Sequence, residues 1–188
     1  MIAYIMTVGR SDVELLKGLL PRQLLAGIGF LAAESLSSVD SIAVSLLVDE
    51  RKPLAIVVNA ETVDEERIEE RRLSLEESVT SFAAGVPVEI VVAVPSLEVV
   101  FFQEPRLLEE IVGRQLTPEQ TAFARALPKM VLGMVLEGCA VKSPVEILTA
   151  ATPQQLEVFR SSPPIEQLSS FLATVQEREK AGAGVGSR

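Results

Sequence analysis

The sequence predicts an α/β protein of the Rossmann-like class, with a mainly parallel four-stranded sheet flanked by helices and a C-terminal helical lobe. Short apolar runs alternate with stretches of helical periodicity up to about residue 95, and proline or glycine stands at most of the boundaries. The apolar runs are continuous instead of alternating with polar residues, which favours parallel strands covered on both faces. Beyond Pro95 the pattern is helical only.

The first two strands are expected at 2–8 and 28–33, joined by a helix. Ser11 can cap this helix, and Glu14 can complete a capping box three residues later. Pro21 limits the helix, and glycines bracket the second apolar run.

The third and fourth strands are expected at 54–59 and 88–94, each introduced by a proline. Apolar residues at helical spacing precede the third strand, and a long helix with a strongly charged outer face separates the two. The order is therefore strand, helix, strand, helix, strand, helix, strand.

The chain is expected to divide into an α/β domain at 1–105, a helical lobe packed on it at 106–180, and a disordered Gly-rich tail at 181–188. The helical segments of the lobe are separated by prolines. Its Met- and Leu-rich segment MVLGMVL is expected to serve packing or an interface, which predicts a homo-oligomer or a protein partner bound through the lobe.

Composition excludes several classes of function. The chain has no His, which removes Ser-His-Asp hydrolysis and His-based zinc sites, and its single Cys139 cannot form an internal disulfide. A net charge of −9 opposes binding of nucleic acid except locally, with a metal, or through a partner protein. The most apolar stretch, 86–102, is interrupted by acids and a proline, so no membrane span is expected, and the absence of a targeting segment predicts a cytoplasmic protein.

Polar residues follow three of the four strands, where the carboxyl ends of parallel strands share one edge and commonly bind ligands. Gly9, Arg10 and Ser11 follow the first strand and could hold a phosphate at a helix N-terminus. Asn59 and Glu61 follow the third strand, and Glu98 follows the fourth in a strongly apolar context, where an acid needs a partner or a metal.

Three of these segments resemble a known family. "TVGRSDVELLKGLLP" resembles the opening of a TOPRIM domain, "LAIVVNAETVD" its Asp-x-Asp strand, and "VAVPSLEVVFF" the Pro-x-x-Glu segment of small TOPRIM-like proteins related to the nuclease half of overcoming-lysogenization-defect proteins. The resemblance covers residues 1–105 well and the rest loosely. It implies a Mg²⁺ site for phosphoryl transfer, with Asp12, Asn59, Glu61 and Glu98 as the metal-site positions.

The acidic motifs depart from the family pattern. Val8 stands where the family has a Glu that acts as general acid/base and ligand, and Asn59 and Glu61 stand at its two metal-binding Asp positions. Mg²⁺ prefers charged oxygen ligands in a near-octahedral arrangement, so these replacements predict a decayed site with weak or absent Mg²⁺ binding.

Three hypotheses remain open. The chain is a TOPRIM-like binding or assembly module related to nucleic acid or a nucleotide, a Mg²⁺-dependent nuclease with a rewired set of acids (Asp12, Glu61, Asp64 and Glu98), or a structural subunit. Three of these acids also have a simpler explanation. Asp12 favours a helix dipole, and Glu61 and Asp64 can be first-turn acids of the following helix.

Overall fold

The computed structural model describes residues 1–185 and confirms the predicted parallel sheet. Its strands agree with the predicted ranges to within one residue at either end. Their spatial order is β2-β1-β3-β4, and every pairing is parallel. The strands are β1 (Ala3–Val8), β2 (Ile28–Ala33), β3 (Leu54–Asn59) and β4 (Val88–Ala93).

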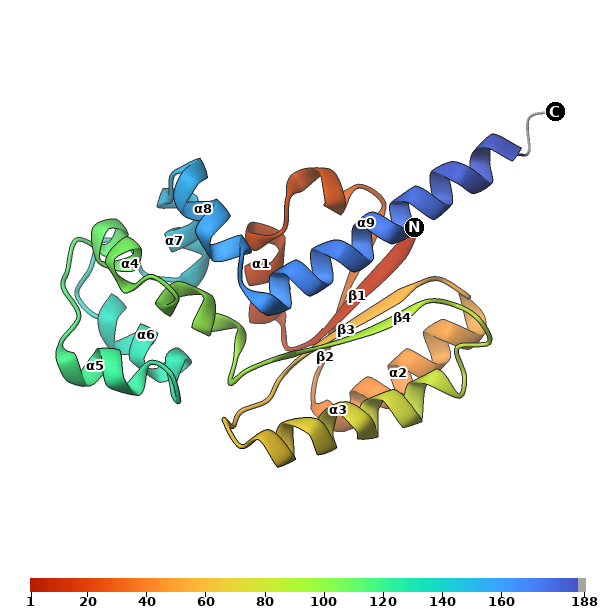
Figure 1. Ribbon diagram of the computed structural model, residues 1–188, viewed down its shortest axis with the longest axis horizontal. Coiled ribbons are helices and arrows are strands. Elements are labelled where there is room, and N and C mark those ends of the chain that lie inside the picture. Colours follow the sequence, from red (N-terminus) through yellow and green to blue (C-terminus); the bar gives the residue numbers. More distant parts are fainter. Residues whose placement is uncertain (186–188) are drawn as a thin grey trace.

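Helices cover both faces of the sheet (Figure 1). One face is covered by α1 (Arg10–Leu19) and the long α9 (Pro163–Val185), with the short η1 (Arg22–Leu25) beside them. The other face is covered by α2 (Leu36–Asp49) and α3 (Glu65–Thr80). This two-sided cover explains why the strands read as continuous apolar runs.

The start of α1 differs from the prediction. The helix begins at Arg10, with Gly9 as the residue before its first turn, and no side chain caps it. Gly9 has φ 87° and ψ 155°, a conformation that residues with a Cβ rarely adopt, and this turns the chain directly from β1 into the helix. The predicted capping role of Ser11 is therefore wrong, because the glycine starts the helix before Ser11 is reached.

The helical lobe is a series of short helices that begin with proline at the first helical position, where its missing N–H has no cost. They lie together at one end of the sheet (Figure 1). The 3-10 helix η2 (Leu97–Phe102) leads into them from β4. They are α4 (Pro105–Val112), α5 (Pro118–Phe123), α6 (Pro128–Leu136), α7 (Pro144–Ala150) and α8 (Pro153–Arg160).

The larger of the two apolar cores joins this lobe to the sheet. It contains residues from β1 and α1 together with residues from α7, α8 and α9. Phe101 of η2 and Phe159 of α8 are fully buried and pack edge to face, with ring centroids 5.2 Å apart. The Nε of Arg160 donates to the carbonyl of Leu19 at 2.6 Å. The core therefore runs across the expected boundary at 105–106.

The C-terminal segment also differs from the expectation. Helix α9 continues through Val185, whereas the sequence predicts a disordered tail at 181–188. Residues 186–188 lie outside the described residues. Of the helices in residues 1–185, none combines the length and apolar character that a membrane span requires.

Candidate ligand site at the carboxyl edge of the sheet

The side chain of Asn59 joins three segments at the carboxyl edge of the sheet. It stands at the last position of β3. Its Nδ2 donates to Oδ2 of Asp12 in α1 at 3.0 Å, and its Oδ1 accepts the N–H of Leu97 in η2 at 3.0 Å. The amide therefore supplies one donor and one acceptor in a place where a carboxylate could only accept.

Asp12 is the most enclosed acid at this edge, with 3% of its surface exposed. Burial raises the pKa of its carboxyl above the ordinary value, and the charge of Glu98 raises it further. The charge of Lys129 and the hydrogen bonds from Asn59 and Ser11 act in the opposite direction on this pKa. The Ser11 contact is long, with Oγ 3.5 Å from Oδ1 of Asp12.

Glu98 is also buried, at 4% exposure, and its partner is a neighbouring hydroxyl. Oγ of Ser96 donates to Oε2 of Glu98 at 2.6 Å. The acid thus has the partner that its apolar surroundings require, and its charge reaches Asp12.

Glu61 lies just past β3 in a left-handed backbone conformation, with φ 56°. Its backbone N–H donates to the carbonyl of Pro95 at 2.7 Å, which ties the loop after β3 to the loop after β4. Its side chain is exposed. A Glu in this conformation is strained relative to glycine by about 1–2 kcal/mol.

Two cations complete the edge, and neither was predicted from the sequence as a site residue. Nη1 of Arg71 in α3 donates to the carbonyls of Asn59 and Ala60, at 2.8 and 2.7 Å. Lys129 lies in the first turn of α6, in the helical lobe. Arg71 could have been suspected as a site residue because it is a cation in a strongly acidic helix. No pattern in the sequence relates Lys129 to the sheet.

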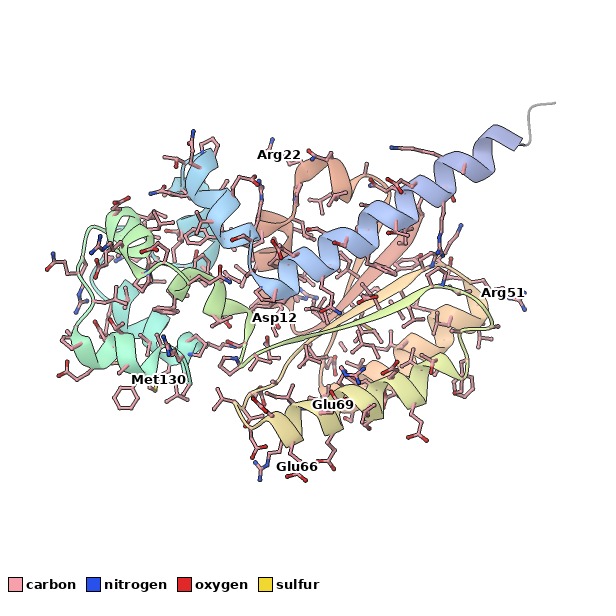
Figure 2. All side chains as sticks on the ribbon, viewed as in Figure 1. Asp12, Arg22, Arg51, Glu66, Glu69 and Met130 are labelled. Atoms are coloured by element: carbon pink, nitrogen blue, oxygen red, sulfur yellow. The ribbon has the colours of Figure 1, made fainter. Side chains whose placement is uncertain are left out.

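These side chains line a cavity of about 300 Å³ at the carboxyl edge. A larger open cleft of about 660 Å³ lies between α2 and α3 and shares Leu36 and Arg71 with it. Figure 2 shows Asp12 near the centre of the molecule, between the sheet and the lobe. The lining of the smaller cavity is Val8, Asp12, Leu36, Val58, Asn59, Glu61, Arg71 and Lys129.

The structure thus brings Asp12, Asn59 and Glu61 to one cavity. Glu98 does not line this cavity, but its charge acts on Asp12. Gly9, Arg10 and Ser11 stand at the adjacent start of α1. Asp64 has a different role, because its Oδ1 caps α3 by accepting the N–H groups of Glu66 and Arg67.

The oxygen donors at this edge depart from the set of charged ligands that a Mg²⁺ ion prefers. In the part of the chain that the structure describes, no three Asp, Glu or Cys side chains are placed to hold a metal together. Asn59 is engaged at both ends of its amide, and Val8 contributes no oxygen. The assignment of Asp12, Asn59, Glu61 and Glu98 as metal ligands stays a prediction.

Comparisons with known proteins give one structural similarity. The sequence matches no family model, and it matches no curated protein. The chain is similar to the C-terminal region of the OLD protein of Xanthomonas campestris pv. campestris, a solved structure, with 12% sequence identity and a TM-score of 0.46. The match covers 92% of this chain and 96% of the OLD chain.

Proposed function

We propose that this chain is a TOPRIM-like binding module that holds a phosphate-bearing ligand at the carboxyl edge of its sheet without hydrolysing it. The observation that carries the proposal is the pair of cations, Arg71 and Lys129, lining the edge cavity beside Asn59. They line the same cavity as Val8, Asn59 and Glu61, the positions at which a hydrolytic site of this kind would need negative metal ligands.

We expect no phosphodiester hydrolysis because of the metal ligands and proton acceptors that are missing at this edge. Metal-assisted cleavage of a phosphodiester needs charged oxygens to fix the ion and a group that accepts a proton from the attacking water. Val8 provides neither, and the amide of Asn59 is neutral and already bonded on both sides. With no His in the chain, no other side chain of ordinary pKa near 7 replaces the missing base.

Phosphate binding is supported by the cations and by the start of α1. The guanidinium of Arg71 is held in place through Nη1 by two backbone carbonyls, so a ligand does not have to order this side chain. Gly9 directs the free N–H groups of the α1 N-terminus toward the same edge.

The size of the space favours a nucleotide or the end of a nucleic-acid strand over a bare phosphate. The 300 Å³ cavity borders the 660 Å³ cleft between α2 and α3, and Leu36 and Arg71 line both. Serine hydroxyls and two acids line this cleft and could bind the hydroxyl groups of a sugar. The net charge of −9 argues against binding a long polyanion without a partner protein.

The test is calorimetric titration of the protein with ADP and with pyrophosphate, in EDTA. Binding without a metal is expected, and Lys129→Met should weaken it about tenfold by removing one charge contact. Arg72→Met is the matched control, because Arg72 adjoins Arg71 in α3 but pairs with Glu69 and Glu76. Equal affinity in the wild-type and Lys129→Met proteins, or no binding at all, would overturn the proposal.

A second experiment addresses the alternative of a working nuclease. Supercoiled and linear DNA should remain uncut in Mg²⁺ or Mn²⁺. Cutting that disappears in Glu61→Ala or Glu98→Ala would instead show that the acids at this edge form an active, rewired site.

A further inference from the structure

A separate cavity, the basic cavity, is lined by Lys17 of α1, Arg22 of η1 and Arg160 of α8, and none of the described residues around it is acidic. Its volume is about 330 Å³, and it lies where the end of α1 and the start of η1 meet α7 and α8. Figure 2 shows Arg22 beside η1, on the side that faces α8. Apolar side chains and Thr149 form the rest of the lining.

This charge composition sets the basic cavity apart in an acidic chain. The sequence has 26 Asp and Glu against 17 Lys and Arg. Four other cavities in the described part of the chain have balanced linings. One basic and one acidic residue line the pocket between β4 and α9, and two of each line the edge cavity, the α2–α3 cleft and the pocket along α4. Three positive charges around one space repel each other, and an anion in that space would offset the repulsion.

Arg160 is positioned for a ligand by the protein itself. Its Nε donates to the carbonyl of Leu19 at 2.6 Å, and its Nη1 donates to Oε1 of Glu157 at 2.7 Å. Its side chain is only 20% exposed, so a ligand does not have to order it. Within residues 1–182, Nη2 donates to no other residue, which leaves its two N–H groups for an oxyanion.

Lys17 and Arg22 differ in how far the fold alone explains them. Lys17 stands in the last turn of α1, where the helix dipole favours a cation, and its Nζ lies 5.5 Å from the ring centroid of Phe30. Arg22 is the first residue of η1 and is exposed. Within residues 1–182, its side chain makes no ion pair or hydrogen bond with another residue. Its charge is therefore available to a ligand.

The acids that pair with two of these cations lie outside the basic cavity. Glu14 pairs with Lys17 at 2.9 Å, and Glu157 pairs with Arg160 at 2.7 Å. The two glutamate side chains are 56% and 71% exposed, and neither lines the cavity. Exposed pairs of this kind are weak, so they leave most of the attraction for an anion in place.

We propose that the basic cavity binds a small dianionic oxyanion group, that of inorganic phosphate or of a phosphomonoester. The three terminal oxygens of such a group suit two guanidinium groups, which bind oxygens in pairs, and one ammonium. Leu148 and Leu156 in the lining would contact the short organic part of an ester. The basic cavity shares no lining residue with the edge cavity, so the proposal does not depend on the function proposed above.

Amide NMR of the full chain tests the proposal by titration with inorganic phosphate and with glycerol phosphate, at constant pH and with ionic strength held by chloride. The signals of Gly18 and Thr149 should shift and saturate, with a dissociation constant on the order of 0.1–1 mM for so small a ligand. Arg22→Gln should weaken this binding about tenfold, and folding should be unaffected because the side chain has no partner to lose. Arg125→Gln is the matched control, because Arg125 is also exposed and lines none of these five cavities.

Lys129→Met separates the basic cavity from the carboxyl edge, and it should leave the shifts of Gly18 and Thr149 unchanged. Tighter binding of glycerol phosphate than of inorganic phosphate would assign the basic cavity to an organic phosphate, and equal or weaker binding would assign it to free phosphate. The proposal would be overturned by the absence of saturable shifts in both titrations, or by equal affinity in the Arg22→Gln and Arg125→Gln proteins. Loss of the shifts in Lys129→Met would also overturn it, because the phosphate would then bind at the edge.

Discussion

The interior and the carboxyl edge of this molecule are held together by different forces. The larger core is continuous from β1 to α9, and its buried residues are Val, Leu, Ile, Ala and two phenylalanines packed edge to face. The edge is joined by the amide of Asn59, the guanidinium of Arg71 and two buried acids. Substitutions in the core should therefore act through volume, whereas those at the edge should act through hydrogen bonds and charge.

This difference separates what a substitution does to stability from what it does to binding. The edge satisfies its own polar groups, so its residues fix the positions of β3, α1 and η2 before any ligand arrives. A site organised in this way does not need a metal ion to assemble it.

The largest effect is expected in the core that joins the two halves of the chain. Phe159→Ala removes a fully buried ring and its edge-to-face contact with Phe101, and should lower the free energy of unfolding by about 3–5 kcal/mol. Urea unfolding monitored by circular dichroism measures the change. Independent unfolding of an intact 1–105 unit would instead show that the lobe is a separate domain.

The second-largest loss of stability is expected at the carboxyl edge of the sheet. Asn59→Leu keeps a side chain of similar size but leaves Asp12 without its amide donor and the Leu97 N–H without its acceptor. The free energy of unfolding should fall by about 2–4 kcal/mol, because both groups lose their partners. Gln103→Leu, an exposed amide in the loop before α4, is the control and should change little. A loss no larger than the control's would mean that Asn59 does not hold the edge.

A smaller effect is expected from neighbouring arginines of α3. Arg71→Met loses two hydrogen bonds to backbone carbonyls and should lower the free energy of unfolding by about 1–3 kcal/mol. Arg72→Met breaks only exposed ion pairs and should have little effect on stability. Thermal unfolding of the two variants side by side checks the difference, and equal melting temperatures would contradict it.

The smallest expected effect is on the pH dependence of the free energy of unfolding. The pKa of Asp12 is raised in the folded state, so the folded protein holds this proton at pH values where the unfolded chain has released it. Stability from this group is complete below the unfolded pKa, near 3.8, and is lost as the pH rises through the raised folded value. In the Asp12→Asn variant, the free energy of unfolding should no longer fall over this pH range for this reason. Chemical unfolding of both proteins over a series of pH values above 3.8 measures the difference, and parallel curves of unfolding free energy against pH would be the contrary result.

The fold was accessible from the sequence because its signals are local. Continuous apolar runs with Pro53 and Pro87 before them located two strands, and parallel pairing then brought Asn59 and the start of α1 to one edge. Arg71 and Lys129 were missed because their roles depend on tertiary placement. The direction of a guanidinium toward backbone carbonyls, and the position of α6 beside the sheet, leave no trace in residue spacing.

The continuation of α9 through Val185 was also missed. The Gly-rich tail 181–188 was expected to be disordered because it offers nothing to pack against the rest of the protein. Here the helix that starts at Pro163 and packs on β4 and η1 extends into the Gly-rich segment. Helical order begun by tertiary packing thus outweighs local propensity at its end.

Magnesium titration by calorimetry tests the central claim most directly, that the carboxyl edge is assembled by Asn59 and cations and not by a metal. The wild-type protein should give no binding heat, and the combined variant Val8→Glu, Asn59→Asp, Glu61→Asp should bind Mg²⁺, because it adds two charged oxygen ligands at the edge and shortens the side chain that carries the third. Tight Mg²⁺ binding by the wild-type protein that is abolished by Glu61→Ala would contradict the account.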